Sequence, residues 1–350
     1  MNRLLRPALV TVAVATLALT GCSSPSAAPS GESSASPESL AGTSITVYNA
    51  QHEELTQAWA DAFEKESGVT VTIRNGSDSE LGNQIIQEGA ASPADVFLTE
   101  NSPAMSLVDN AKLFALVDTD TLAQVPNAYK PSSGTWTGIA ARSTVLVYNP
   151  SLLPEAELPA SLLDLEKSEW KGKWAASPSG ADFQAIVSAL LEQKGTAATE
   201  TWLAGMKANF SEYKGNSTVM KAVNAGEVAA GVIYHYYWFG DQAGTGENSN
   251  NTKLYYFKNE DPGAFVSVSG GGVLKTSKNA AAGQAFLKFI TGKAGQGILQ
   301  TGTSFEYPVG SGVAANPALP ALDTLEAPVI DPSKLNSTEV TTLMTAAGLI

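Results

Sequence analysis

The sequence predicts an α/β protein in which mainly parallel sheets are flanked by helices. Short apolar runs typical of buried strands alternate with longer segments whose apolar residues recur at helical spacing. This alternation indicates crossover connections between parallel strands. It starts near residue 44 and continues for about 300 residues, enough chain for two domains.

The first unit begins with an apolar strand at residues 44–50. The helix that follows carries Leu55, Trp59 and Phe63 on one face at a spacing of four, and Gly68 ends it. Strand, helix and strand are then predicted at residues 69–73, 80–89 and 94–98.

The second unit begins after Arg142 and has the same alternation. Its helices are marked by Phe183, by Met220 with Val223 before Gly226, and by an apolar face between residues 280 and 291. Strands are predicted at residues 144–148, 173–176, 228–234, 264–269 and 272–275.

The chain opens on a segment typical of export rather than of the fold. Arg3 and Arg6 precede an apolar run over residues 7–19, and the run closes on a Leu-Thr-Gly-Cys sequence at Cys22 that resembles a bacterial lipobox. We expect a lipoprotein signal peptide at 1–21 and lipidation of Cys22. Residues 22–43 are rich in Ser, Ala, Pro and Gly, which predicts a flexible tether with a reach of about 26 Å.

Charge and cysteine content exclude several classes of function. Loss of Arg3 and Arg6 with the signal peptide leaves 19 basic against 34 acidic residues, a formal charge of −15. So acidic a protein disfavours nucleic acid and anionic lipid surfaces. Cys22 is the single cysteine, so disulfides and thiol catalysis are not expected.

Four oxygen and nitrogen donors follow predicted strands. His52 follows the first strand, Glu100 follows the strand at 94–98, and Tyr236-Tyr237 follow the strand at 228–234. Ligands of open α/β sheets bind at the carboxyl ends of strands, so we expect all four donors at the functional edge, where the two units could converge across a cleft. Phenolates are hard ligands that suit Fe(III). Taken alone, a Tyr-Tyr pair is more often a packing element, and His52 and Glu100 could be solvated polar residues.

Five segments together resemble the ferric-iron binding proteins of the FbpA type, which are receptors of Fe(III) ABC importers. The segments are Thr46–His52, Pro93–Glu100, Tyr236–Trp238, Asp261–Ala264 and Glu306–Pro308. The resemblance implies a two-lobed fold of the periplasmic-binding-protein type II kind, with crossing hinge strands. The implied first lobe is 44–142 with a return segment 267–317, and the second is 143–266 with the C-terminal segment 318–350.

The resemblance also implies roles for the site residues. His52 and Glu100 would be iron ligands of the first lobe, and Tyr236 and Tyr237 ligands of the second. A synergistic anion, phosphate or carbonate, would complete the coordination. The residues expected to hold this anion are Ser179, Gly180 and Ala181 at a helix start, together with Asn216. Ser179-Gly180 could instead be a plain turn that starts the helix.

Two residues near this implied site leave alternatives open. Arg142 could neutralise the anion or pair with Glu100. The family often has asparagine before the tyrosine pair, where this chain has Tyr234-His235; Tyr234 could replace one anion contact or lose it. His235 resembles no family ligand.

We therefore expect a monomeric, membrane-anchored extracytoplasmic receptor that passes Fe(III) to an ABC permease and ATPase. The alternatives are a receptor for a phosphonate, thiamine or polyamine, and a metal-sensing lipoprotein. An enzyme is not expected, since the sequence has no Gly-x-Ser-x-Gly or His-Glu-x-x-His motif and no cysteine nucleophile.

Overall fold

The structure is a computed structural model that describes residues 40–310 and 312–350. All of these residues belong to one compact unit. The predicted signal peptide, Cys22 and residues 22–39 of the tether lie outside the described residues and stay predictions. The predicted end of the tether at residue 43 is wrong: Leu40 is buried with Ile45 and Val69 in an apolar core, and the Gly42 N–H donates to the Gly68 carbonyl at 2.9 Å. Within the described part of the chain, no helix is long and apolar enough to cross a membrane.

The described residues form a nine-stranded sheet in the order β2-β1-β3-β9-β4-β7-β5-β6, with β8 paired to β4. The strands are β1 (Ser44–Asn49), β2 (Thr70–Asn75), β3 (Val96–Leu98), β4 (Thr137–Tyr148), β5 (Trp174–Ala176), β6 (Ser211–Glu212), β7 (Ala230–Tyr234), β8 (Lys253–Tyr255) and β9 (Val266–Val273). The outer strands pair in parallel, as the strand-helix alternation predicts. The long strands β4 and β9 pair antiparallel with each other and with their neighbours.

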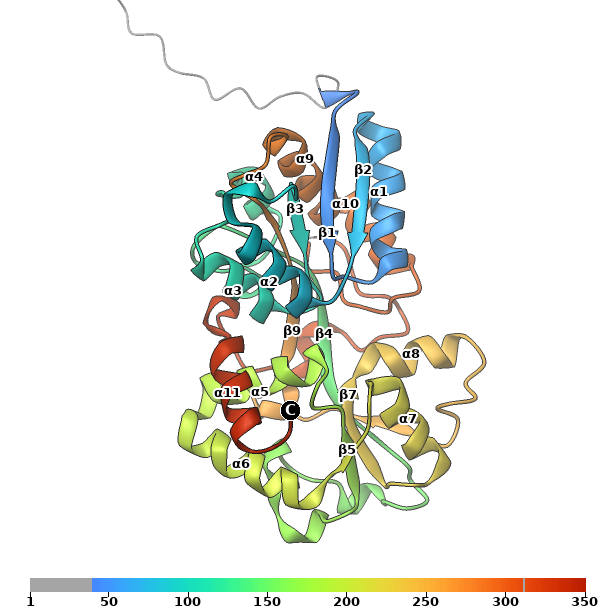
Figure 1. Cartoon of the computed structure of the whole chain (residues 1–350). Helices are drawn as coiled ribbons and strands as arrows, with labels where there is room; N and C mark the ends of the chain where they lie inside the picture. Colours follow the sequence, from blue (N-terminus) through green and yellow to red (C-terminus); the bar gives the residue numbers. More distant parts are fainter. Residues whose placement is uncertain (1–39, 311) are drawn as a thin grey trace, which may run out of the picture. The chain divides into compact units, whose positions relative to one another are not determined.

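The α-helices flank these strands (Figure 1). They are α1 (Glu53–Ser67), α2 (Asp78–Glu88), α3 (Ser102–Asn110), α4 (Thr119–Ala123), α5 (Ala181–Lys194), α6 (Thr196–Asn209), α7 (Asn216–Ala225), α8 (His235–Ala243), α9 (Ala280–Thr291), α10 (Lys293–Thr301) and α11 (Ser337–Ala346). Helix α1 buries the predicted face with Leu55, Trp59 and Phe63, and Gly68 ends it in the left-handed conformation at φ 71°.

One predicted break in the sheet is wrong. Residues 264–269 and 272–275 were expected to be separate strands, but β9 runs without interruption through Gly270, Gly271 and Gly272. A Cβ at Gly270 would lie 2.3 Å from Met105 Cγ, and one at Gly272 would lie 2.7 Å from the Phe114 ring. These glycines therefore permit close packing against the strand and do not mark a turn.

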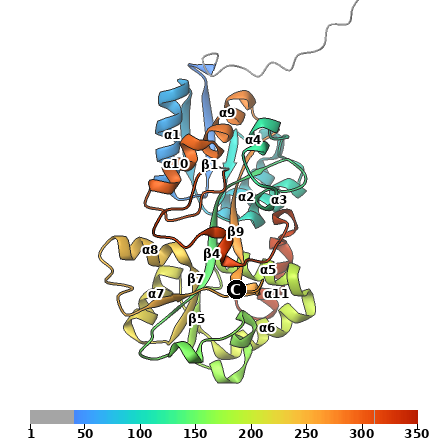
Figure 2. The same ribbon diagram turned by 180° about the vertical axis from the view of Figure 1, so that it is seen from behind.

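Strands β4 and β9 connect two groups of strands, one on β1, β2 and β3 and one on β5, β6 and β7 (Figures 1 and 2). Each group has its own apolar core. Trp59, Phe63 and Phe286 are buried in the first, whereas Trp174 and Trp202 are buried in the second. Besides the two crossing strands, helix α11 and the residues before it pack on α3, where Ser106 Oγ donates to the Pro332 carbonyl at 2.9 Å.

Candidate metal centre

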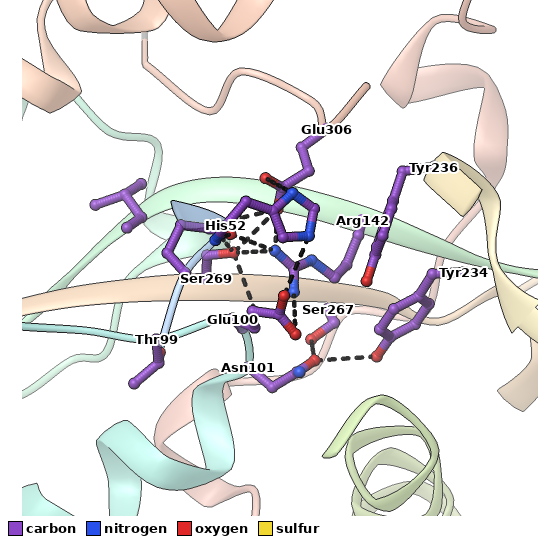
Figure 3. A network of polar contacts seen from close by, with 12 residues as sticks. His52, Thr99, Glu100, Asn101, Arg142, Tyr234, Tyr236, Ser267, Ser269 and Glu306 are labelled. Atoms are coloured by element: carbon purple, nitrogen blue, oxygen red, sulfur yellow. Dashed lines mark hydrogen bonds and ion pairs between the residues drawn. The ribbon is translucent and has the colours of Figure 1, made fainter. Parts of the chain in front are cut away.

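The structure brings the four predicted donors to one place. His52 is the N-cap of α1 and is separated from β1 by Ala50 and Gln51, and Glu100 lies between β3 and α3. Tyr236 and Tyr237 are in the first turn of α8, directly after β7. His52 Nε2 lies 3.1 Å from Glu100 Oε1, and the rings of His52 and Tyr236 meet edge to face with centroids 4.9 Å apart (Figure 3). His52 and both tyrosines line a cleft of about 730 Å3.

The hydroxyls of the two tyrosines converge on a residue that the sequence analysis did not single out. Tyr236 Oη and Tyr237 Oη each donate to Asp182 Oδ2 at 3.2 Å. Asp182 is the second residue of α5 and is buried. An acidic residue in the first turn of a helix is common enough that its position gave no signal of a site.

Asp182 is also held by two amides. Asn216 Nδ2 donates to its Oδ2 at 2.7 Å, and Asn101 Nδ2 donates to its Oδ1 at 3.0 Å. Burial raises the pKa of the Asp182 carboxyl, and the negative charge of Glu100 adds to this rise. The amide of Asn216, expected to contact an anion, thus already contacts a protein carboxylate.

Both tyrosines are protonated at neutral pH in this metal-free arrangement. Burial raises the pKa of Tyr236 well above its usual value, and Asp182 and Glu100 raise it further. The pKa of Tyr237 is raised for the same leading reasons, burial and Asp182. A cation bound at the two phenol oxygens would have to displace these protons.

The guanidinium of Arg142 lies beneath the site and is fully buried. It forms an ion pair with Glu306, and its Nη1 lies 3.7 Å from Glu100 Oε2 (Figure 3). Its Cζ also stands 5.4 Å from the centre of the Tyr236 ring. Of the two roles considered for Arg142, the structure shows the pairing with carboxylates; the sequence did not predict Glu306 as a partner.

The predicted anion cradle lies against a different cavity. Ser179, Gly180 and Ala181 line a space of about 590 Å3, together with Asp78 and Asn101. The carboxylate of Asp78 accepts the backbone N–H groups of Glu100 and Asn101 at 2.9 and 3.0 Å. Burial and the charge of Glu100 nevertheless raise the pKa of Asp78 to about 8.

Tyr234 and His235 have structural partners of their own. Tyr234 Oη donates to Asn101 Oδ1 and to the backbone carbonyl of Asp182, each at 3.3 Å. His235 is fully buried, and its Nδ1 accepts the Ser143 N–H at 3.1 Å. Burial lowers the pKa of His235 to about 3, so its ring is neutral at physiological pH.

The donor set determines which metals the site suits. Among the described residues, no group of three or more His, Cys, Asp or Glu side chains is arranged to hold a metal ion. A metal at this cleft would therefore need the tyrosines as well as His52 and Glu100. Two phenols, a carboxylate and one imidazole form a hard, oxygen-rich set, which favours a small, highly charged cation.

The fold and the cleft between its two groups of strands define a solute-binding protein, and residues 91–336 match the family of bacterial extracellular solute-binding proteins. The chain belongs to this family, whose members bind solutes and are not enzymes. It is 68% identical over 306 residues to the Fe(3+)-binding periplasmic protein of Serratia marcescens, covering 87% of this chain and 90% of that protein. The major ferric iron-binding protein of Neisseria meningitidis serogroup B is 35% identical over 311 residues, covering 87% of this chain and 93% of that protein.

Among solved structures, iron-bound HitA from Pseudomonas aeruginosa has a TM-score of 0.82 and 40% sequence identity. The match covers 88% of this chain and all of that one. The two-lobed fold of these binding proteins, predicted from the resemblance, is therefore confirmed.

Proposed function

We propose that this chain is an extracytoplasmic receptor that binds one Fe(III) ion and delivers it to an ABC importer. The ligands are His52 and Glu100 on one side of the cleft and Tyr236 and Tyr237 on the other. The observation that carries the proposal is the convergence of two tyrosine hydroxyls beside a His–Glu pair, at 3.2 Å and 3.1 Å from their partners. The similarity to ferric iron-binding proteins over most of the chain supports the choice of metal.

Charge balance suits a trivalent ion. Two phenolates and the Glu100 carboxylate supply three negative charges, and neutral His52 supplies a fourth donor. Deprotonation of the tyrosines is unfavourable without metal because burial and Asp182 raise their pKa. Binding therefore exchanges two protons for one Fe(III), so the empty cleft does not accumulate uncompensated negative charge.

Four side chains leave two positions of a six-coordinate ferric ion to be filled. We propose that a synergistic anion, phosphate or carbonate, fills these positions. The alternative ligand for them is the Asp182 carboxylate. Asp182 is favoured by the two tyrosine hydroxyls that already point at its Oδ2, and by Asn216, which holds the same oxygen. Arg142 offsets negative charge beneath the site in either case.

We also propose that the two lobes close on the metal. The first lobe comprises 44–142 with 267–317, and the second comprises 143–266 with 318–350. The antiparallel pairing of Arg142 with Ser267 on β4 and β9 supports a hinge at this crossing. Ligands shared between two lobes favour closure only while a metal bridges them. Small-angle scattering should show a more compact particle on loading with iron.

Anchoring and partners complete the proposal. Lipidated Cys22 would hold a monomeric receptor at the outer surface of the cell membrane. A tether over 22–39 would let the folded body, which includes residues 40–43, reach a permease and its ATPase. Mass spectrometry of the membrane fraction should find a diacylglyceryl group on Cys22. A chain found unmodified and released into the medium would contradict the anchor.

The metal itself is tested by analysis of bound iron. After exposure to excess ferric citrate and gel filtration, we expect one iron per chain. Calorimetry with a phosphonate, thiamine and a polyamine should show no binding. Tight binding of one of these compounds, with no retained iron, would contradict the proposed function.

A further inference from the structure

The segment Glu306-Tyr307-Pro308 is one of the five that resemble segments of ferric-iron binding proteins, yet it contains none of the proposed ligands. Glu306 is fully buried, and Tyr307 forms a bridge with Ala141 on β4, which fixes the segment beside the crossing strands. Burying a carboxylate is unfavourable unless it is paired, and Arg142 provides that pair. The remaining question is what the second oxygen of this carboxylate does.

The two oxygens of Glu306 have different surroundings. Oε1 accepts from Arg142, from Gln51 Nε2 at 3.3 Å and from Ser269 Oγ at 3.4 Å. Oε2 is buried without a hydrogen-bond partner, and it lies 3.6 Å from His52 Nδ1. A buried carboxylate oxygen without a partner is unfavourable, so the nearby imidazole N–H is its natural donor.

We infer that Glu306 is a positioning residue that keeps a proton on His52 Nδ1 and so presents the lone pair of Nε2 to the metal. Nε2 already faces Glu100, the second proposed ligand of the same lobe, at 3.1 Å. A metal-bound imidazole characteristically donates its other N–H to a carboxylate, which fixes both ring orientation and tautomer. A shift of about 0.5 Å would bring Nδ1 within hydrogen-bond distance of Oε2.

The backbone of His52 is also held in place, by the side chain of Gln51. The His52 backbone N–H donates to Gln51 Oε1 at 2.7 Å, and Arg142 Nη2 donates to the same oxygen at 3.2 Å. Arg142 thus fixes Glu306 and, through Gln51, the residue that Glu306 orients. The contacts that Arg142, Gln51 and Ser269 make to Glu306 all use its Oε1. Glu306 Oε2 is therefore left for the imidazole alone.

This arrangement makes the variant Glu306→Gln informative. The Arg142 and Gln51 groups at Oε1 can only donate, so the amide carbonyl must take that position and the NH2 must face His52 Nδ1. Two donors would then oppose each other in the metal-loaded protein. We expect iron loss to a chelator to be about 10–100-fold faster, as for other changes behind a metal ligand. Glu88→Gln is the matched control, since Glu88 bonds Tyr48 and Ser92 in the same lobe, away from the cleft.

The tautomer can be read directly, since the chain has only two histidines. In full-length protein labelled with 15N-histidine and loaded with Ga(III), a diamagnetic stand-in for Fe(III), His52 should carry its proton on Nδ1. His235 should show the opposite tautomer, because its Nδ1 accepts from Ser143, and it serves as the internal reference. This measurement needs no variant, so it decides the matter even if Glu306→Gln fails to fold.

The inference rests on the proposed function, and the outcomes separate the two. A wild-type chain that takes up neither Fe(III) nor Ga(III) would contradict both. Uptake of metal with the His52 proton on Nε2, or a folded Glu306→Gln protein that loses iron at the wild-type rate, would overturn the inference alone. Proton on Nδ1 with faster loss in Glu306→Gln and an unchanged rate in Glu88→Gln would support it.

Discussion

The rings of Tyr236 and Tyr237 are stacked, with centroids 4.3 Å apart and planes inclined by 29°. Consecutive residues of a helix normally point about 100° apart, so this stacking brings two phenol oxygens to one side of the chain. Both oxygens reach the same atom, Asp182 Oδ2. In the proposed function, Fe(III) takes the place of the two protons that these hydroxyls share with Asp182.

Removing one phenol oxygen should therefore disable the site. Tyr236→Phe and Tyr237→Phe each delete an anionic donor while keeping the stacked ring. We expect iron affinity to fall by more than the about 10–100-fold that changes behind a ligand cause. Competition with a chelator measures this loss. Tyr213→Phe is the control, because its hydroxyl meets Glu227 outside the cleft. Wild-type affinity in both cleft variants would contradict the site.

Replacing the first-lobe donors should have a smaller effect. His52→Ala and Glu100→Ala each remove one ligand, but both side chains are about one-quarter exposed, so water can take the vacated position. We expect weaker iron binding. The coloured phenolate-to-iron charge-transfer band should be retained, since both phenolates remain. Equilibrium competition and the visible spectrum of each variant measure the two effects. Loss of this band in His52→Ala or Glu100→Ala would show that the tyrosines do not bind iron without the replaced side chain.

The two remaining coordination positions of the iron could be filled by Asp182 or by an external anion, and one variant distinguishes these alternatives. Asp182→Asn keeps the shape and the amide contacts but removes the charge. If Asp182 occupies one of these positions, the variant should lose iron faster, by about tenfold or more, and depletion of phosphate and carbonate should matter little for the wild type. If the anion occupies them, depletion should accelerate loss from the wild-type protein. Chelator-driven release in matched buffers distinguishes the two.

The sequence predicted the four donors but not their surroundings, and the reason is physical. His52, Glu100 and the tyrosines each follow a strand. The strands of the two groups run toward each other, so their carboxyl ends, where ligands bind, face each other across the cleft. Glu306 follows no strand, and Asp182, although it lies past the end of β5, resembles any acidic residue at a helix start. Their roles depend on which oxygen each carboxylate turns toward a neighbour brought close by the fold. The continuity of β9 through Gly270–Gly272 was likewise missed, because close packing and a turn both require glycine.

Iron retention should weaken steeply in acid. Burial and Asp182 raise the pKa of both tyrosines, so both are protonated in the empty cleft and each iron bound releases two protons. The apparent affinity should then fall about hundredfold per pH unit from the phenols alone. Although burial lowers the pKa of His52, Glu306 and Glu100 outweigh this and raise it, which adds a third proton at lower pH. Competition with a chelator of known protonation constants measures the slope; a flat profile would contradict phenolate ligation.

The metal-free protein should lose stability in acid through His235. Its pKa is about 3 in the folded protein and about 6.5 in an unfolded chain, so the unfolded state binds the extra proton between these values. The contribution of neutral His235 to the free energy of unfolding is complete above pH 6.5 and is lost as the pH falls toward 3. His235→Asn keeps an acceptor for the Ser143 N–H and should flatten this part of the curve. Denaturant unfolding of both proteins from pH 7 to pH 4 tests the difference; parallel curves would contradict it.

The central claim, that Tyr236 and Tyr237 bind Fe(III) as phenolates, is tested most directly by the visible spectrum during titration with ferric citrate. Phenolate-to-iron charge transfer should give a coloured band that grows linearly and stops at one equivalent of iron. Resonance Raman excitation within the band should enhance tyrosinate ring modes, and these should weaken in Tyr236→Phe and in Tyr237→Phe. Saturation with iron and no such band would contradict the account.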